Sequence, residues 1–262
     1  MINKKNNITN GFLLLIMAAV FLMPYISSCG KSGNATSVGL NVQLEVLNLS
    51  PTIEPVDLYL GYLKQDVTPY SYPFNQGYFY LNTIDTPLQI KSSATNIATS
   101  NFLTLYPNFQ ADHKYSLFIT GNYNTLDTGA NTITSVFTED DSTAIPNVGF
   151  GKIRFVNASI PSGLNTGIDV TANGVAAFSA IKFGKVSPYI QLPAGNYIFQ
   201  MNVTGTPQTT LSTSLGTTTI QDGTLYTLYA YGVPARTDSA AFGTGIVING
   251  ASTAVTTAAK AK

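Results

Sequence analysis

From residue 40 onward, non-polar and polar residues alternate in short runs along the chain. Residues 42–46 read Val-Gln-Leu-Glu-Val, and residues 152–155 read Lys-Ile-Arg-Phe. Because successive side chains of a strand point to opposite faces, each run predicts a strand with one buried and one solvated face. No window of a dozen residues shows the period of an amphipathic helix. The pattern predicts an all-β protein.

The two halves of the chain also resemble each other, because three landmarks recur in the same order. These are the pairs Asn48 and Asn157, Asp57 and Asp169, and Tyr115 and Tyr226. Their separations are 109, 112 and 111 residues, which are too similar to arise by chance. We interpret them as a tandem duplication of a unit of about 100 residues, the size of an immunoglobulin-like β-sandwich.

The duplication suggests the domain boundaries. We expect one β-sandwich at residues 40–142 and a second at 143–249, followed by a small, polar and disordered tail at 250–262. Asn173-Gly174 predicts a tight hairpin in the second domain, because both residue types tolerate positive φ.

The first 28 residues have the composition of an export signal. Lys4 and Lys5 precede a non-polar run from Phe12 to Met23, and no acidic residue occurs before position 29. This run is shorter than the roughly 20 residues that a membrane-spanning helix needs. A cleaved signal peptide is therefore favoured over a permanent transmembrane anchor.

The sequence Ile26-Ser27-Ser28-Cys29 resembles the lipobox of bacterial lipoprotein precursors. The resemblance implies that the Cys29 thiol receives a diacylglycerol, that the signal is cut before Cys29, and that the new amino terminus is acylated. Residues 29–39 would then form the lipidated cysteine and a flexible tether. No acidic residue follows Cys29 directly, which by the same resemblance favours the outer membrane. The alternative is an ordinary secretory signal with an incidental cysteine, or a buried free cysteine.

Several segments resemble the domain-of-unknown-function family 4397 of exported bacterial proteins, which often occurs twice per chain. They are residues 152–159 (KIRFVNAS), 168–170 (IDV), 192–197 (LPAGNY) and 226–227 (YT). Residues 136–141 (VFTEDD) resemble the acidic turn that precedes the second copy in lipoproteins of Bacteroidota. The resemblance implies an exported β-sandwich protein and supplies no catalytic residues.

Composition narrows the possible functions. Only 10% of the 262 residues are charged, and 13 basic residues balance 13 acidic ones, so the chain lacks the basic surface of a nucleic-acid-binding protein. It contains one cysteine and one histidine. This excludes a disulfide framework, a Cys/His zinc site and Cys–His catalysis.

Three groups of polar residues are candidates for chemistry. His113, the only imidazole, precedes a predicted strand without a nucleophile elbow nearby, so we interpret it as a solvated turn residue rather than a triad base. Asp57 and Asp169 occupy matching places in separate domains, which favours a structural role, such as capping a backbone N–H, over a glycosidase pair. Glu139–Asp141 lacks the spacing of a calcium loop, so we expect a solvated interdomain turn.

Tyrosines provide the candidate binding residues. Tyr70 and Tyr72 lie in a proline-containing segment, and Tyr62 lies upstream of it. Aromatic side chains on loops can stack on sugar rings or anchor a protein partner. Packing in the core or at a corner of the sandwich is the alternative, and the absence of tryptophan favours it over sugar binding.

Together these observations predict two tandem immunoglobulin-like antiparallel β-sandwiches after a lipoprotein signal peptide. We expect a non-enzymatic protein of the outer membrane, held there by lipid on Cys29, that needs no cofactor or metal. It would act as a binding or structural module for a glycan, a protein or an envelope-assembly partner. An accessory domain of a polysaccharide-processing system, or a cryptic hydrolase, is the alternative function.

Overall fold

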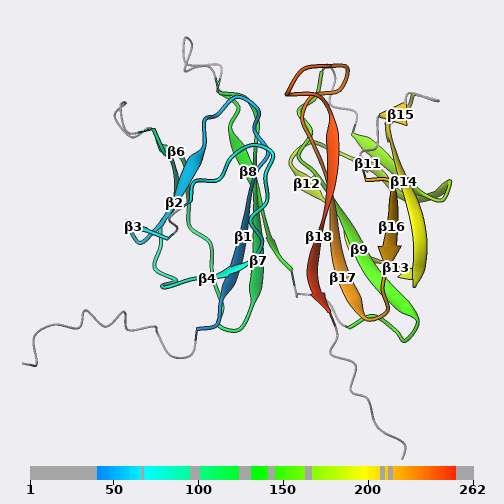
Figure 1. Cartoon of the computed structure of the whole chain (residues 1–262), viewed down its shortest axis with the longest axis horizontal. Helices are drawn as coiled ribbons and strands as arrows, with labels where there is room; N and C mark the ends of the chain where they lie inside the picture. Colours follow the sequence, from blue (N-terminus) through cyan, green and yellow to red (C-terminus); the bar gives the residue numbers. More distant parts are fainter. Residues whose placement is uncertain are drawn as a thin grey trace, which may run out of the picture. The chain divides into compact units, whose positions relative to one another are not determined.

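A computed structural model describes the chain over the following ranges (Figure 1): residues 40–65, 68–94, 101–123, 131–140, 145–162, 167–206, 210–211 and 215–251. The regular elements within these ranges are β-strands. The same ranges contain no helix that is long and apolar enough to cross a membrane. The predicted signal peptide, Cys29 and the tether lie outside the described residues.

Domain 1 is a sandwich of two sheets. Its strands are β1 (Gln43–Asn48), β2 (Val56–Leu60), β3 (Leu63–Lys64), β4 (Phe79–Tyr80), β5 (Leu88–Ser92), β6 (Asn101–Leu105), β7 (Lys114–Thr120) and β8 (Thr134–Glu139). One sheet has the order β4-β1-β7-β8 and the other β3-β2-β5-β6. Their inner faces enclose a core that includes Leu44, Leu58, Ile90 and Leu117.

Domain 2 repeats this plan. Its strands are β9 (Phe150–Asn157), β10 (Ile168–Ala172), β11 (Val175–Ile181), β12 (Lys185–Val186), β13 (Ile190–Pro193), β14 (Gly195–Val203), β15 (Thr210–Leu211), β16 (Thr217–Ile220), β17 (Thr224–Tyr231) and β18 (Gly243–Ala251). One sheet has the order β12-β9-β17-β18, with β13 also paired to β9. The other has the order β11-β10-β14-β15, with β16 also paired to β14.

The two domains share the pairing of their first strand. In each domain the first strand runs parallel to a late strand, β1 with β7 and β9 with β17, whereas the other pairs are antiparallel. The register aligns Leu44 with Tyr115, and Ile153 with Tyr226. Asp57 and Asp169 lie on β2 and β10, the second strand of each domain, so all three sequence landmarks fall on equivalent strands. The prediction of tandem β-sandwiches is confirmed.

The strand order differs in detail from that of an immunoglobulin constant domain, whose sheets are ABED and CFG. Lettered in chain order, domain 1 has the sheets D-A-G-H and C-B-E-F. The first strand therefore lies inside a sheet, next to the seventh, and both of its edges are paired.

The recurring asparagines make equivalent contacts inside the two sandwiches. The Asn48 side chain donates a hydrogen bond to the backbone oxygen of Tyr70 at 3.1 Å, and the Asn157 side chain donates one to that of Ile181 at 2.7 Å. Each asparagine sits at the end of the first strand of its domain and is buried. Each bond thus ties that strand to another segment of the same domain, which explains why both copies carry asparagine.

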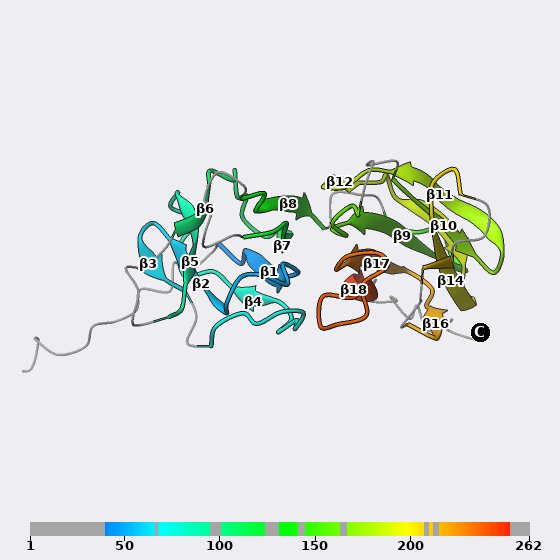
Figure 2. The same ribbon diagram turned by 90° about the horizontal axis from the view of Figure 1, so that it is seen from above.

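The domains pack against each other through the outer faces of the sheets that contain β1 and β9 (Figure 2). The buried cluster consists of Leu47, Leu49, Phe118 and Val136 from domain 1 and Val156, Ala158, Tyr229 and Val247 from domain 2. Because the registers align Leu47 with Phe118 and Val156 with Tyr229, both domains contribute the same strand positions. The interface is therefore isologous in type, as in a two-fold symmetric dimer.

This packing corrects one expectation from the sequence. Alternation predicts a solvated outer face for β1 and β9, yet Glu45 is 2% exposed and Arg154 is 5% exposed. The prediction was wrong because the outer face of each strand is covered by the other domain.

Gly232 provides a test of the close approach between β17 and the chain that leads to β18. Its φ is +71°, and a Cβ atom there would lie 2.2 Å from the backbone oxygen of Ala241. Gly174 has a similar φ of +78° but open space around it. We expect Gly174→Ala to lower the free energy of unfolding by about 1–2 kcal/mol through backbone strain alone. Gly232→Ala should lower it by about 3 kcal/mol or more, because backbone must also move. Urea denaturation measures both, and equal losses would contradict the steric argument.

Candidate functional site

The three candidate tyrosines are not brought together by the fold. Tyr62 is 71% exposed at the tip of the hairpin between β2 and β3, just after the end of β2. Tyr70 is 1% exposed and pairs with Val56 at the start of β2, so it belongs to the core of domain 1. Of the two interpretations weighed for Tyr70, the structure shows packing in the core, so Tyr70 is not available as a binding residue.

Tyr72 takes part in the contact between the domains. Its ring meets that of Tyr231 edge to face, with the centroids 5.9 Å apart. Burial raises the pKa of the Tyr72 hydroxyl to about 12, with smaller contributions from Tyr231 and Asp238. Of the three tyrosines, Tyr62 alone presents most of its side chain to solvent.

The candidate polar residues lie in separate places. His113 Nδ1 is 2.9 Å from Glu139 Oε1, so the histidine is part of a half-exposed pair rather than a fully solvated turn. Asp57 lies 2.7 Å from Lys64 Nζ. Asp169 accepts hydrogen bonds from the backbone N–H of Ala180 at 2.6 Å and from a threonine hydroxyl. The capping role expected for this acid is thus observed for Asp169.

The acidic run before the second domain differs most from expectation. Asp140 was expected in a solvated turn, but it is fully buried. Asp141 lies outside the described residues. Asp140 directly follows β8, and its N–H donates to the backbone oxygen of Lys114 at 2.7 Å. This bond continues the pairing of β8 with β7 and turns the carboxylate toward domain 2.

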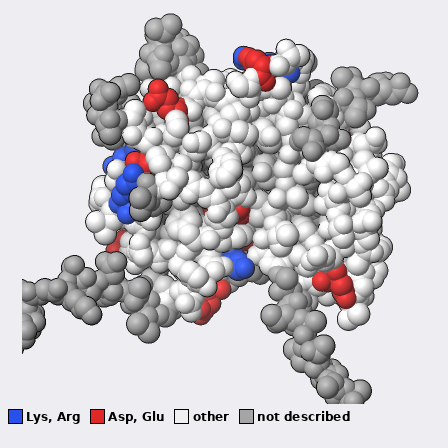
Figure 3. Space-filling model, viewed as in Figure 1, with Lys and Arg blue, Asp and Glu red and all other residues white. Residues whose placement is uncertain are grey.

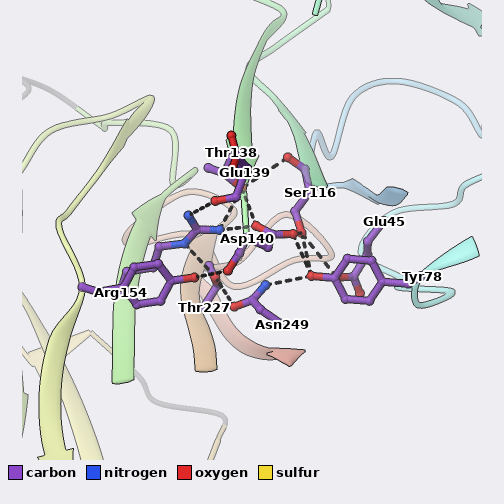
Figure 4. Close-up of polar contacts among 10 residues, drawn as sticks. Glu45, Tyr78, Ser116, Thr138, Glu139, Asp140, Arg154, Thr227 and Asn249 are labelled. Atoms are coloured by element: carbon purple, nitrogen blue, oxygen red, sulfur yellow. Dashed lines mark hydrogen bonds and ion pairs between the residues drawn. The ribbon is translucent and has the colours of Figure 1, made fainter. Parts of the chain in front are cut away.

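Four side chains donate hydrogen bonds to the Asp140 carboxylate (Figure 4). Ser116 Oγ lies 2.6 Å and Tyr78 Oη 2.7 Å from Oδ2, and Thr138 Oγ1 lies 2.9 Å from Oδ1. The fourth donor is Arg154 Nη2, which forms an ion pair with Oδ1. The carboxylate therefore has partners on both oxygens.

Arg154 lies on β9 of domain 2 and reaches across to domain 1. Its Nη1 donates to the backbone oxygen of Glu139 at 2.9 Å, and its Nη2 to Thr138 Oγ1 at 2.9 Å. Its Nε donates to Thr227 Oγ1 at 2.9 Å within domain 2. The Tyr189 ring lies 4.8 Å from the guanidinium carbon, which adds a cation–π contact.

These contacts close into a ring across the two domains (Figure 4). Thr227 Oγ1 donates to Asn249 Oδ1 at 2.6 Å, and Asn249 Nδ2 donates to Tyr78 Oη at 2.8 Å. Tyr78 Oη then donates to Asp140, which faces Arg154. We call the set Tyr78, Asp140, Arg154, Thr227 and Asn249 the interdomain ring.

Burial shapes the titration of the acids here. Removal from water raises the pKa of Asp140, while the Arg154 charge and the hydroxyl donors oppose that change. Burial raises the pKa of Glu45 from 4.5 to about 7, and the nearby Asp140 charge raises it further, against hydrogen bonds from Asn75 and Ser116. Glu45 therefore titrates close to neutral pH.

The arrangement serves to join the domains. Each member of the interdomain ring donates to or accepts from another member, so its hydrogen-bonding capacity is directed inward. Within the described part of the chain, no three His, Cys, Asp or Glu side chains gather as a metal site would require. The ring fixes one domain against the other.

One feature of the sequence does indicate that the outer faces of β1 and β9 are buried: non-polar residues also occupy some of the outward-facing positions. Leu47 and Val156 occupy outward positions of β1 and β9, next to inward non-polar neighbours. Such continuous non-polar runs are typical of strands buried on both faces. These runs indicate which part of each sheet is covered, but they do not identify the segment that covers it.

The ion pair can be tested with a double-mutant cycle on Asp140 and Arg154. Either Asp140→Leu or Arg154→Met alone should lower the free energy of unfolding by about 3–5 kcal/mol, because one buried charge loses its partner. The double variant should lose clearly less than the sum of the single losses. Chemical denaturation measures all three. Arg236→Met, in the exposed pair with Asp238, is the matched control and should change little. Additive losses would contradict the coupling.

Glu45 predicts an unusual pH dependence of stability. Between pH 4.5 and about 7, folded Glu45 holds a proton that the unfolded chain releases, so its contribution to stability falls as pH rises through this window. Glu45→Gln removes this loss and should make the protein more stable than wild type by roughly 3 kcal/mol at pH 8, with little gain at pH 4.5. Thermal unfolding across this range measures the difference. Glu54→Gln, which removes an exposed carboxylate, should follow the wild-type profile, and a Glu45→Gln profile parallel to both would refute the assignment.

Comparison with known proteins agrees with the repeated architecture. The family model described as Domain of unknown function (DUF4397) matches the chain twice, over residues 42–163 and 162–260. A comparison with curated proteins finds no match. The two matches together span most of the chain and correspond to its two sandwiches. The chain therefore belongs to the DUF4397 family, of which it carries two copies in tandem.

Proposed function

We propose that this protein is an exported, lipid-anchored component of the cell envelope whose paired β-sandwiches form a non-catalytic binding or structural module. The observation that supports the non-catalytic role is the location of Glu45 and Asp140, the two acids among the described residues whose pKa is raised by burial. In an enzyme such groups face a substrate cleft. Here both lie in the closed contact between the domains, where Asp140 pairs with Arg154 and Glu45 is buried without a positive partner of its own in the described part of the chain.

The joined domains suit a scaffold. A non-polar cluster and the interdomain ring fix the second sandwich on the first, so loops of both domains keep a constant separation. A rigid pair of this kind can hold a glycan, a protein or an assembly partner at low entropic cost. A role as an accessory domain in polysaccharide processing is compatible with the same scaffold.

The anchor is proposed from Ile26-Ser27-Ser28-Cys29. The described part of the chain starts at Leu40, and the 11 residues from Cys29 to Gly39 precede it. Several acyl chains, each stabilised by about 0.8 kcal/mol per buried CH₂ group, hold a protein on a membrane where a single chain would not. The outer membrane is the proposed location.

Metabolic labelling with palmitate tests the anchor. Wild-type protein should take up label and migrate as the processed form, whereas Cys29→Ala should remain an unlabelled precursor. Because Cys29 is the single cysteine of the chain, no other thiol can accept the lipid. Ser32→Ala, a substitution three residues further on, is the control and should be processed and labelled normally. An unlabelled wild-type protein would overturn the proposal.

A further inference from the structure

Exposed aromatic side chains gather at one end of domain 1. Among the described residues, four aromatic side chains are strongly exposed: Tyr62, Phe74, Tyr80 and Tyr106. Three of them, all except Phe74, lie at the end where β1 begins. Leu63, 65% exposed, adjoins Tyr62. We call Tyr62, Leu63, Tyr80 and Tyr106 the tyrosine end.

Backbone pairing places these residues at a common end. Tyr80 pairs with Gln43, the first residue of β1. The N–H of Leu81 then donates to the Val42 oxygen at 2.9 Å, which carries the chain across this end.

The same crossing segment continues to the other sheet. The Gly61 N–H, next to Tyr62, donates to the Pro87 oxygen at 3.1 Å. The following residue, Leu88, pairs with Leu105, and Tyr106 comes directly after it. The ends of β2 and β6 therefore meet the start of β5 at this end of the domain.

Leu40, where the described chain starts, is tied to the same end. Its backbone oxygen accepts a hydrogen bond from the Asp112 N–H at 2.7 Å. Eleven residues separate it from the proposed lipid on Cys29, a span of about 40 Å at most when fully extended. Phe74 lies toward the opposite end, where Asn75 bridges to Leu47 near the end of β1, roughly 13 Å further along the strand than Gln43.

The backbone conformation at Tyr62 is unfavourable for a tyrosine, which favours a functional role for its exposed ring. Gly61 and Tyr62 form the hairpin turn with φ values of +54° and +67°. Glycine or asparagine usually occupies the second position of such a turn, and positive φ in a bulky residue is rare. An exposed tyrosine at this position adds backbone strain and fills no core. Backbone strain of this kind is typical of residues at functional sites.

We propose that the tyrosine end rests on the surface of the lipid bilayer that holds the anchor. Tyrosine is enriched at membrane–water interfaces, where its ring meets the acyl boundary and its hydroxyl stays hydrated. Charges around this end are mixed, since Lys64 pairs with Asp57 and Asp85 is exposed, so the contact suits zwitterionic headgroups rather than anionic ones. The contact rests on the proposed lipidation, because the anchor supplies most of the affinity. Figure 3 shows how sparse the charged side chains are on the visible face of the molecule.

Single tryptophans can report on this contact, because the natural chain contains none. The full-length lipidated protein, purified from membranes, is inserted into phosphatidylcholine vesicles with or without bromine on the acyl chains. Tyr62→Trp and Tyr106→Trp should each lose at least about half of their fluorescence in brominated vesicles and emit at shorter wavelength. Phe74→Trp, an exposed aromatic position at the opposite end, is the matched control and should keep its emission in both vesicle types.

Flotation of the same vesicles separates the two proposals. Protein that floats with the lipid, yet shows no quenching at position 62 or 106 or equal quenching at position 74, would refute the orientation and leave the anchor intact. Wild-type protein that does not float would refute the anchor, and the bilayer contact with it. Unfolding curves that match wild type show that each tryptophan variant retains the fold.

Discussion

Two opposite charges, Asp140 and Arg154, lie buried where the domains meet, and neither could remain there without the other. Taking each ion out of water costs several kcal/mol, which an ion pair offsets only with good geometry and further hydrogen bonds. Asp140 has hydroxyl donors on both oxygens, and Arg154 donates from all three nitrogens. Such a pair adds less net stability than non-polar packing would, but it can form in only one relative placement of the domains. The contact of Leu47 and Phe118 with Val156 and Tyr229 depends on that placement.

The architecture of each domain follows from local features of the sequence. Alternation along residues 42–46 and 152–155 identifies strands whose inner faces are now seen in the two cores. The recurring Asn48 and Asn157 identify the duplication, because each is required at the same bend inside its own sandwich. These signals depend on neighbours a few residues away or on the repeat itself, and both are visible in a single sequence.

The interdomain ring depends on contacts that no local pattern contains. Arg154 has the polar character of a solvated position, and it becomes buried because another domain covers its strand. Asp140 lies in an acidic run and likewise has the character of a solvated residue, although the other domain covers it. The sequence leaves Tyr70 undecided between a binding loop and the core, since its proline-containing segment resembles a surface loop although Tyr70 pairs with Val56 and fills the core. The errors at Arg154 and Asp140 both arise because the other domain covers these residues.

The duplication explains why the ring is asymmetric. The registers make Glu45 the counterpart of Arg154 and Ser116 the counterpart of Thr227. By the pairing of the last strands, Asp140 corresponds to Asn249, and the Ser116–Asp140 hydrogen bond corresponds to that between Thr227 and Asn249.

Two copies of domain 1 facing each other in this way would bury four acids at the contact. Two copies of domain 2 would bury two arginines without a carboxylate. Like charges at a desolvated contact cost several kcal/mol, so both pairings are disfavoured, whereas domain 1 against domain 2 places Arg154 on Asp140. An interface that is isologous in its non-polar residues has thus become specific through its charged ones. Glu45 shows the remaining cost of this contact, because burial, and to a lesser extent the nearby Asp140 charge, raises the pKa of its carboxyl group.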